Sequence, residues 1–190
     1  DFAKLLYPPM QVADIFIQCI TLAHAGSDQI KAQVIARDVG LKLKNGLKNQ
    51  KGEPIKPVAV HGHLILGLQK PTVWPVPKES MQDLWGQMKM SKSLPTSAIY
   101  MTDSENEIRS KIKGAFCPEK EVDFNPLMDW AKYLVFINES SHLKISRPDK
   151  FGGNKIYSSF DYLKSDFASG VLHPMDLKTV MGPLSGEQIL

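Results

Sequence analysis

Cysteine is scarce in this sequence, and no cysteine pair has the spacing of a metal site. The two cysteines, Cys19 and Cys117, lie far apart in a chain of 190 residues and form no Cys-x-x-Cys. The five histidines are not spaced as zinc ligands either. We therefore expect two reduced thiols, as in a cytoplasmic protein, and no metal site made by the protein itself.

Long apolar runs and a strong excess of charge are also missing. No apolar run approaches the roughly 18 residues that a membrane span requires, so we expect no membrane partner. The formal net charge of +3 permits RNA as a partner but does not argue for it. The length suits one large domain or two small ones. Because the chain opens at Asp1 inside an apparent element, we expect a fragment, or a processed or split chain.

A short lysine-rich stretch, here called the lysine loop, cannot form a core element by itself. It reads Lys89-Met90-Ser91-Lys92-Ser93 and has neither a helical apolar stripe nor a strand alternation. Its ammonium groups, hydroxyls and loop N–H groups can together hold a polyanion such as a chain of phosphates. A solvated surface loop is the alternative, because charge runs usually face water.

The first helix predicted by the sequence carries three polar side chains on one side. The prolines favour a helix that begins near residue 8 or 9 and runs to about residue 23. Tyr7, Gln11 and Asp14 are separated by four and three positions, so they can share one side. They either line a pocket that hydrogen-bonds a polar small molecule or are capping and surface residues.

The later elements alternate between helix and strand and then become mainly helical. A second helix is expected over residues 29–44, with Gln29 in its first turn, facing the end of the first helix. Short strands over 57–61 and 97–101 favour a parallel α/β sheet. We place a domain boundary after residue 115, giving domains 1–115 and 116–190. Further elements are expected at 79–85 (helix), 143–147 (strand) and in helices that start at Ser104, Asn125, Ser159 and His173.

Several motifs, taken together, resemble the tyrosyl-tRNA synthetases of the archaeal and eukaryotic branch. The lysine loop is similar to the second signature of class I aminoacyl-tRNA synthetases. The resemblance runs from Tyr7 to about Lys178. The motifs that carry it are Tyr7-Pro8-Pro9-Met10-Gln11-Val12-Ala13-Asp14-Ile15, Gly26-Ser27-Asp28-Gln29, Ala115-Phe116-Cys117-Pro118, Arg147-Pro148-Asp149-Lys150-Phe151-Gly152-Gly153 and Leu172-His173-Pro174-Met175-Asp176-Leu177-Lys178.

This resemblance implies an α/β fold and a ligase activity. The expected architecture is the second half of a Rossmann-like class I catalytic domain followed by a mainly helical anticodon-binding domain. The implied reaction is that of a tyrosine–tRNA ligase, which uses ATP with Mg²⁺ to form tyrosyl-adenylate and then charges tRNA-Tyr. A homodimer is also implied. Because the first class I signature, a His-Ile-Gly-His-like segment, does not occur in the sequence, we expect the isolated chain to be inactive.

Two other functions stay open at this point. One is a non-catalytic RNA- or protein-binding paralogue that kept the fold, and the other is the related tryptophanyl enzyme.

The resemblance also implies roles for individual residues in the catalytic part. Tyr7, Gln11, Asp14 and Gln29 would line the tyrosine pocket, with Asp14 accepting from the substrate hydroxyl and the two glutamines holding the ammonium end. Lys89 and Lys92 would be the catalytic residues, stabilising charge on the ATP phosphates within the loop that Met90, Ser91 and Ser93 complete.

A second set of roles is implied for the helical part. Phe151 would stack near the anticodon, and His173, Pro174 and Asp176 would belong to the same site. A hydrophobic plug beside the turn at residues 152–153 is the alternative interpretation of Phe151.

Overall fold

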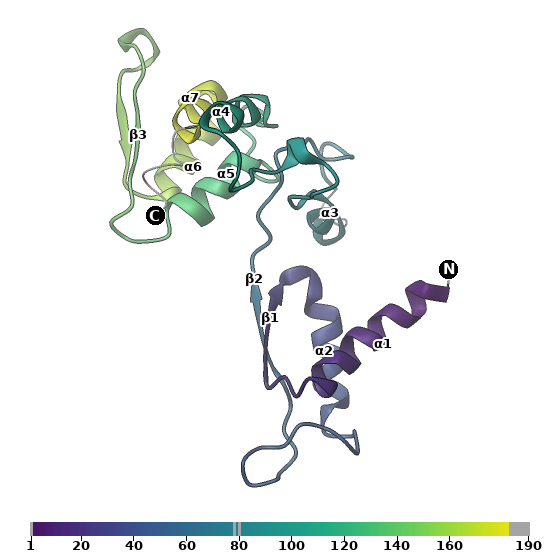
Figure 1. Cartoon of the computed structure of the whole chain (residues 1–190). Helices are drawn as coiled ribbons and strands as arrows, with labels where there is room; N and C mark the ends of the chain where they lie inside the picture. The colour runs from purple at the N-terminus through teal and green to yellow at the C-terminus, as the bar shows by residue number, and fades with distance from the viewer. Residues whose placement is uncertain (1, 78, 80, 183–190) are drawn as a thin grey trace. The chain divides into compact units, whose positions relative to one another are not determined.

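The computed structural model describes residues 2–77, 79 and 81–182, which form two compact units (Figure 1). Unit 1 comprises residues 1–64 and unit 2 residues 65–190. This division lies well before the domain boundary expected near residue 115. The reason is that the segment carrying the lysine loop is hydrogen-bonded to residues beyond 115; for example, the Trp130 Nε1 donates to the Leu66 carbonyl at 2.7 Å.

Unit 1 contains a β–α–β arrangement preceded by a long helix. Strands β1 and β2 pair in parallel, with Leu22 opposite Val58, and helix α2 lies between them in sequence. This confirms the expected α/β character and the parallel pairing. The elements are α1 (Phe2–Ile17), β1 (Leu22–Gly26), the 3-10 helix η1 (Ser27–Gln29), α2 (Ile30–Gly40) and β2 (Val58–Gly62).

Helix α1 differs from its prediction at both ends. It spans Phe2–Ile17 rather than residues 8–23, and Pro8 and Pro9 lie inside it. Proline lacks an N–H, so the carbonyls four residues earlier lose their helical bonds there, yet the helix continues through them. Cys19 adopts a φ of 54°, in the left-handed region, where the chain leaves the helix to enter β1. Strand β1 therefore begins at Leu22, inside the range predicted to be helical.

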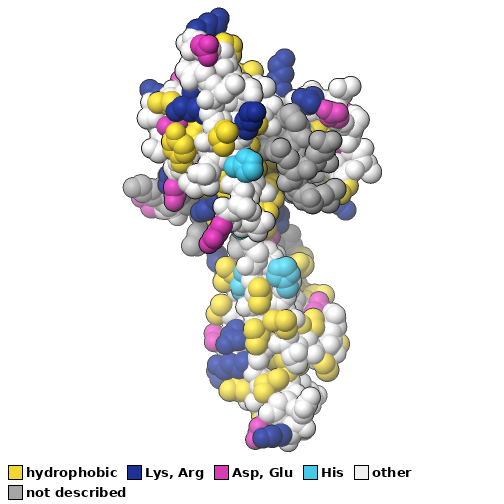
Figure 2. All heavy atoms as spheres, turned by 90° about the vertical axis from the view of Figure 1, so that its left-hand side faces the viewer, with side chains coloured by type: hydrophobic (Ala, Val, Ile, Leu, Met, Phe, Trp, Pro, Cys, Tyr) yellow, Lys and Arg dark blue, Asp and Glu magenta, His cyan; other side chains and the backbone are white. Residues whose placement is uncertain are grey.

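The core of unit 1 is a small contact between its two helices. Val12 and Ile15 of α1 and Ala32 and Ala36 of α2 are buried. The small alanines allow the two helices to approach closely, and α2 ends at Gly40 rather than at the predicted residue 44. Outside this contact, unit 1 has large apolar side chains at its surface, and on the face seen in Figure 2 they lie beside Lys and Arg side chains.

Unit 2 is mainly helical and encloses a larger core. Figure 1 shows α4, α5, α6 and α7 grouped together with the antiparallel pair of β3 and β4. The elements are α3 (Met81–Met88), η3 (Pro95–Ser97), α4 (Glu105–Gly114), α5 (Pro126–Trp130), the π-helix η4 (Ala131–Val135), β3 (Leu143–Ile145), η5 (Asp149–Phe151), β4 (Lys155–Tyr157), α6 (Phe160–Ser169) and α7 (Pro174–Met181). Side chains that are fully buried in this core include Leu127, Tyr157, Leu163, Phe167, Leu172 and Leu177.

The four helix starts predicted in unit 2 are confirmed. Ser104 forms a capping box with Glu107 at the start of α4. Asn125, Ser159 and His173 each accept backbone N–H groups of the helix that follows them. Such caps satisfy N–H groups that have no partner inside a helix, which is why these residue types mark helix starts in sequence.

The strand predicted over residues 97–101 is wrong. The Leu68 N–H donates to the Ser97 carbonyl at 2.9 Å, but this bond stands at the end of the η3 turn and starts no ladder. The Tyr100 N–H then donates to the Asp103 Oδ2 at 2.8 Å, and the chain turns there instead of continuing as a strand. A different strand, β4, pairs with the expected β3. Residue 80 of the expected 79–85 helix and residues 183–190 of the expected second domain lie outside the described residues.

The cap of α5 gives a stability test. Asn125 is completely buried, caps α5 and donates its Nδ2 to the Glu121 carbonyl at 2.9 Å. Asn125→Ala removes these bonds and leaves buried partners unsatisfied, so the free energy of unfolding should fall by about 2–3 kcal/mol. Ser104→Ala, at the exposed cap of α4, is the control and should cost about 1 kcal/mol. Urea denaturation followed by circular dichroism measures both, and equal losses would contradict the expectation.

Candidate functional site

Two of the four residues expected to bind tyrosine are in contact within unit 1. Gln11 comes from α1 and Gln29 ends η1, and the Gln11 Nε2 donates a hydrogen bond to the Gln29 Oε1. Both side chains are half-buried. The junction of α1 and η1 therefore presents a pair of amides, which can donate and accept hydrogen bonds.

The other two residues lie on α1 at exposed positions. The Tyr7 side chain is 66% exposed, and Asp14 is also exposed. Helical spacing places these residues about one turn before and one turn after Gln11, on the same side of α1. Unit 1 thus brings Gln11 and Gln29 together and keeps a phenol and a carboxylate accessible on the helix that carries Gln11.

The lysine loop follows α3 and makes a tight turn. The Ser91 Oγ lies 2.8 Å from the Ser93 Oγ, and the Ser93 N–H points to the same Ser91 oxygen at 3.3 Å. Lys92 is exposed at this turn, whereas Lys89 and Met90 are half-buried. Met90 packs against the core of unit 2. The loop therefore has an anchored base and an exposed ammonium group at its turn.

Both ends of the lysine loop are attached to the buried segment Leu66–Leu68. At the start of the loop, the Gly67 N–H donates to the Met88 carbonyl at 2.6 Å, and Leu66 forms an antiparallel bridge with Lys89. After the loop, the Leu68 N–H donates to the carbonyl of Ser97, a residue with no exposed surface. The same short segment thus fixes the entry and the exit of the loop.

A cavity of about 450 Å³ lies beside this segment but contains none of the predicted site residues. Leu68, Gln69 and Cys117 are among its lining residues. Burial raises the pKa of the Cys117 thiol above its usual value, although a hydrogen bond from Asn125 acts in the opposite direction. A thiol with a raised pKa stays protonated and is a poor nucleophile.

In the helical part, Phe151 is an exposed aromatic residue. Its side chain is 60% exposed, so it does not plug the core beside the glycine turn. The Lys150 Nζ lies 4.9 Å from the centre of the ring. Gly152 and Gly153 have φ values of 96° and 67°, which L side chains rarely adopt, and this turn ends the η5 helix directly after Phe151. The ring is therefore presented at the end of a sharp turn.

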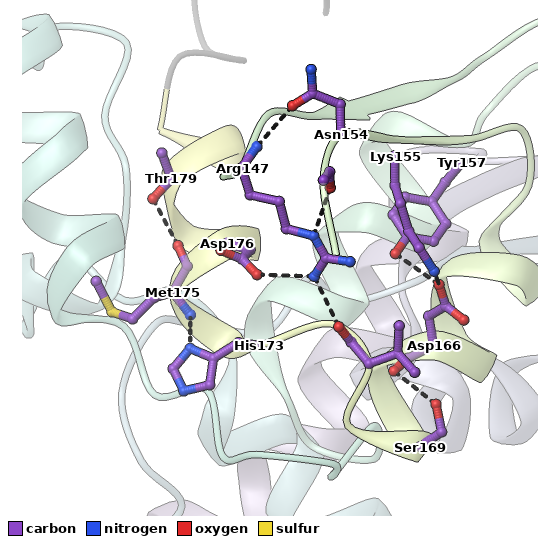
Figure 3. Close-up of polar contacts among 12 residues, drawn as sticks. Arg147, Asn154, Lys155, Tyr157, Asp166, Ser169, His173, Met175, Asp176 and Thr179 are labelled. Carbon is purple, nitrogen blue, oxygen red and sulfur yellow. Dashed lines mark hydrogen bonds and ion pairs between the residues drawn. The ribbon is translucent and has the colours of Figure 1, made fainter. Parts of the chain in front are cut away.

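Arg147 connects the turn that carries Phe151 to the start of α7 (Figure 3). Its side chain is 3% exposed and lies among main-chain carbonyls. The Nε donates to the Gly153 carbonyl at 2.9 Å, and one terminal nitrogen donates to the Val171 carbonyl at 2.8 Å and to the Asp176 Oδ2 at 3.3 Å. A buried guanidinium needs such partners for its donors. It fixes the η5 turn, residue 171 and Asp176 relative to one another.

His173, Pro174 and Asp176 all lie at the N-terminal end of α7. The His173 Nδ1 accepts the Met175 N–H at 3.1 Å, so this nitrogen is unprotonated and the exposed ring carries its proton on Nε2. Pro174 is buried, and Asp176 is half-buried against Arg147. Through Arg147, Asp176 is joined by hydrogen bonds to the turn that follows Phe151, and His173 and Pro174 precede it in the chain at the start of α7.

A second polar cluster lies nearby in Figure 3, between β4 and α6. The Asp166 Oδ2 accepts from the Lys155 Nζ at 2.5 Å and from the Tyr157 hydroxyl at 3.0 Å. Burial, and then the bond to Asp166, raise the pKa of Tyr157 well above its usual value. The phenol therefore stays neutral and serves as a hydrogen-bond donor that joins β4 to α6.

No role is predicted for Arg147 from the sequence, although it opens the motif that contains Phe151. Charged residues are seldom buried, so composition places an arginine before a proline-containing loop at the surface. No role is predicted from the sequence for the Leu66–Leu68 segment either, because its hydrogen-bond partners lie far away in sequence.

Among the described residues, no three His, Cys, Asp or Glu side chains gather as metal ligands would. Within residues 2–77 and 81–182, no helix is both long and apolar enough to cross a bilayer.

Comparisons with known proteins agree in pointing to one family. The chain is 56% identical over 182 residues to a tyrosine–tRNA ligase of Thermococcus kodakarensis, covering 95% of this chain and 48% of that protein. It is 41% identical over 181 residues to the tyrosine–tRNA ligase of Aeropyrum pernix, covering 95% and 47%. The chain thus spans about half the length of these relatives.

A solved structure gives the same result. The crystal structure of the Pyrococcus horikoshii tyrosyl-tRNA synthetase complexed with L-tyrosine matches with a TM-score of 0.88 and 51% identity, over 100% of this chain and 51% of that one. The model of the family described as "tRNA synthetases class I (W and Y)" matches residues 1–182. Because that match covers both units and every motif discussed above, the chain belongs to the class I tRNA synthetases of the W and Y family.

Proposed function

We propose that this chain is part of a tyrosine–tRNA ligase, which activates tyrosine with ATP and transfers it to tRNA-Tyr. One observation carries the proposal: a lysine loop with an anchored base and an exposed Lys92 occurs in a chain 56% identical to a tyrosine–tRNA ligase. The solved relative from Pyrococcus horikoshii, which contains L-tyrosine, supports tyrosine as the amino acid.

The reaction needs positioning and charge stabilisation rather than a covalent enzyme intermediate. A tyrosine carboxylate oxygen attacks the α-phosphorus of ATP, and the bond to the β,γ-diphosphate breaks, so that tyrosyl-adenylate and pyrophosphate form. A hydroxyl of the terminal ribose of the tRNA then attacks the acyl carbon and releases AMP. Lys92, with Lys89 and the hydroxyls of Ser91 and Ser93, neutralises the charge that develops on the phosphates. The Mg²⁺ arrives with ATP as part of that substrate.

The polar residues of α1 and η1 are proposed to hold tyrosine. Asp14 accepts a hydrogen bond from the substrate phenol, and Tyr7 lines the same pocket. The amides of Gln11 and Gln29 hold the ammonium end. The accessibility of Tyr7 and Asp14 and the contact between the two glutamines support these roles.

The end of α7 and the η5 turn are proposed to read the anticodon. Phe151 stacks on an unpaired base, and His173 Nε2 and Asp176 contact base edges beside Pro174. The 60% exposure of the Phe151 ring and the common link through Arg147 support this assignment. The correspondence of the chain to the second half of a synthetase, the homodimer and the cytoplasmic location remain predictions from the resemblance.

Lys92 gives the first test of the activity. In the complete native polypeptide that carries this sequence, Lys92→Ala should lower kcat for tyrosine-dependent exchange of pyrophosphate into ATP by about 10²–10³-fold, because a preorganised positive charge at the phosphates is lost. Lys144→Ala removes an exposed lysine of β3 and should leave the exchange unchanged. Exchange that requires tryptophan rather than tyrosine would reject the proposed substrate, and no exchange with either would reject the activity.

Asp14 tests the choice of amino acid. Asp14→Ala removes the carboxylate that accepts from the substrate phenol, and a hydrogen bond to a charged group contributes about 1.5–3 kcal/mol. The preference for tyrosine over phenylalanine in kcat/KM should therefore fall by about 10–100-fold. Asp38→Ala, an exposed carboxylate of α2, is the control and should keep the preference. If both variants discriminate as the unchanged protein does, Asp14 does not contact the phenol.

Phe151 tests the anticodon site separately from the chemistry. Phe151→Ala should weaken binding of a tRNA-Tyr transcript by about 1–3 kcal/mol, because stacking on one base is lost, and should leave pyrophosphate exchange intact. Ile156→Ala removes another exposed apolar side chain of unit 2 and is the matched control. Filter binding measures both affinities, and equal affinities would remove Phe151 from the site.

A further inference from the structure

The Leu66–Leu68 segment is hydrogen-bonded to the lysine loop region and also to later parts of the chain, among them Phe116. Leu66 is 0% and Leu68 3% exposed, so the N–H and C=O groups of this segment must find hydrogen-bond partners within the protein. Gly67 and Leu68 donate to the two ends of the loop region, at Met88 and Ser97. The N–H and C=O of Leu66 itself are used elsewhere.

Both main-chain groups of Leu66 are held by two consecutive residues of α5. The Leu66 N–H donates to the Asp129 Oδ2 at 2.9 Å, and the Trp130 Nε1 donates to the Leu66 carbonyl at 2.7 Å. Asp129 is 8% and Trp130 6% exposed. An acceptor and a donor thus fix one peptide residue from the same helix, more than sixty positions away in sequence.

The helix that supplies these two side chains is itself firmly placed. Asn125 caps α5 by accepting the Leu127 and Met128 N–H groups, and it donates to the Glu121 carbonyl. Leu127 and Met128 have almost no exposed surface. α5 cannot shift without disturbing this core, so Asp129 and Trp130 hold Leu66 in a fixed position. Because Leu66 forms the bridge with Lys89, the start of the lysine loop is held in place as well.

We propose that Asp129 and Trp130 are positioning residues for the lysine loop. Neither contacts a substrate; they hold Leu66 so that the base of the loop, and with it Lys92, stays in register with the phosphates. This inference rests on the proposed function, which makes Lys92 a phosphate-binding residue. Misplacement of a charged group by about 1 Å can cost on the order of 10²-fold in rate, so a change in a buried bond at the loop base is enough to be measured.

Trp130→Phe is the central variant because it keeps a buried aromatic ring while it removes the indole N–H together with the five-membered ring that carries it. In the complete native polypeptide, we expect the KM for ATP in tyrosine-dependent pyrophosphate exchange to rise about 10-fold and kcat to fall, while the KM for tyrosine stays within about twofold. Amide hydrogen exchange over residues 88–97 should be at least about 10-fold faster. A merely structural role would change stability without separating ATP from tyrosine.

Two companion variants complete the design. Asp129→Asn keeps one oxygen acceptor for the Leu66 N–H and should show a weaker form of the same ATP-specific defect. Tyr157→Phe removes a hydrogen bond to Asp166 in the same unit, a bond in which neither Leu66 nor the lysine loop takes part, and should change neither the ATP parameters nor the exchange of residues 88–97. If Trp130→Phe does not fold, Asp129→Asn carries the test.

Each result decides one question. Equal changes in the KM for ATP and for tyrosine, or unchanged hydrogen exchange over residues 88–97 in both α5 variants, would overturn the positioning role. An unsubstituted protein that shows no tyrosine-dependent exchange would instead overturn the proposed function. The two failures remain distinguishable because the hydrogen-exchange measurement needs neither tyrosine nor ATP.

Discussion

The structure of unit 2 depends on the pairing of main-chain groups in the buried Leu66–Leu68 segment. A buried N–H or C=O without a partner is costly, so the segment must be bonded on both sides. Its partners include the ends of the lysine loop, Phe116 and two side chains of α5. These bonds attach the loop to the helical part of the chain. For this reason the compact units divide at residue 64 rather than near 115, where composition changes.

Arg147 shows the same constraint for a buried side chain. Its guanidinium is almost fully buried, so its donors must find acceptors, and they find the Gly153 and Val171 carbonyls and the Asp176 carboxylate. Satisfying one cation thereby fixes the turn after Phe151 and the first turn of α7. In both parts of unit 2, the lysine loop and the η5 turn, exposed residues proposed to bind substrates are held in place by buried polar groups.

Local signals in the sequence predicted much of the fold, and long-range contacts account for the rest. Ser104, Asn125 and Ser159 act through N–H groups a few positions away, so their helix starts could be predicted and are confirmed. The glycine turn at residues 152–153 is local too. By contrast, the burial of Arg147 depends on partners distant in sequence, Val171 and Asp176, which periodicity does not reveal. The strand over 97–101 fails for a local reason, because the turns at Ser97 and Tyr100 interrupt the apolar run.

The pair of glutamines illustrates how far the candidate tyrosine site follows from sequence. Spacing alone placed Gln11 beside Tyr7 and Asp14, but only the structure shows its amide donating to Gln29. In that arrangement the Gln29 Oε1 is occupied by the neighbouring amide. A bound ammonium group would have to share or replace this bond, and since a half-buried neutral hydrogen bond contributes only about 1 kcal/mol, a charged donor can displace it readily. The hydrogen bond between the glutamines therefore forms without a ligand, and it would not prevent the proposed binding of an ammonium group.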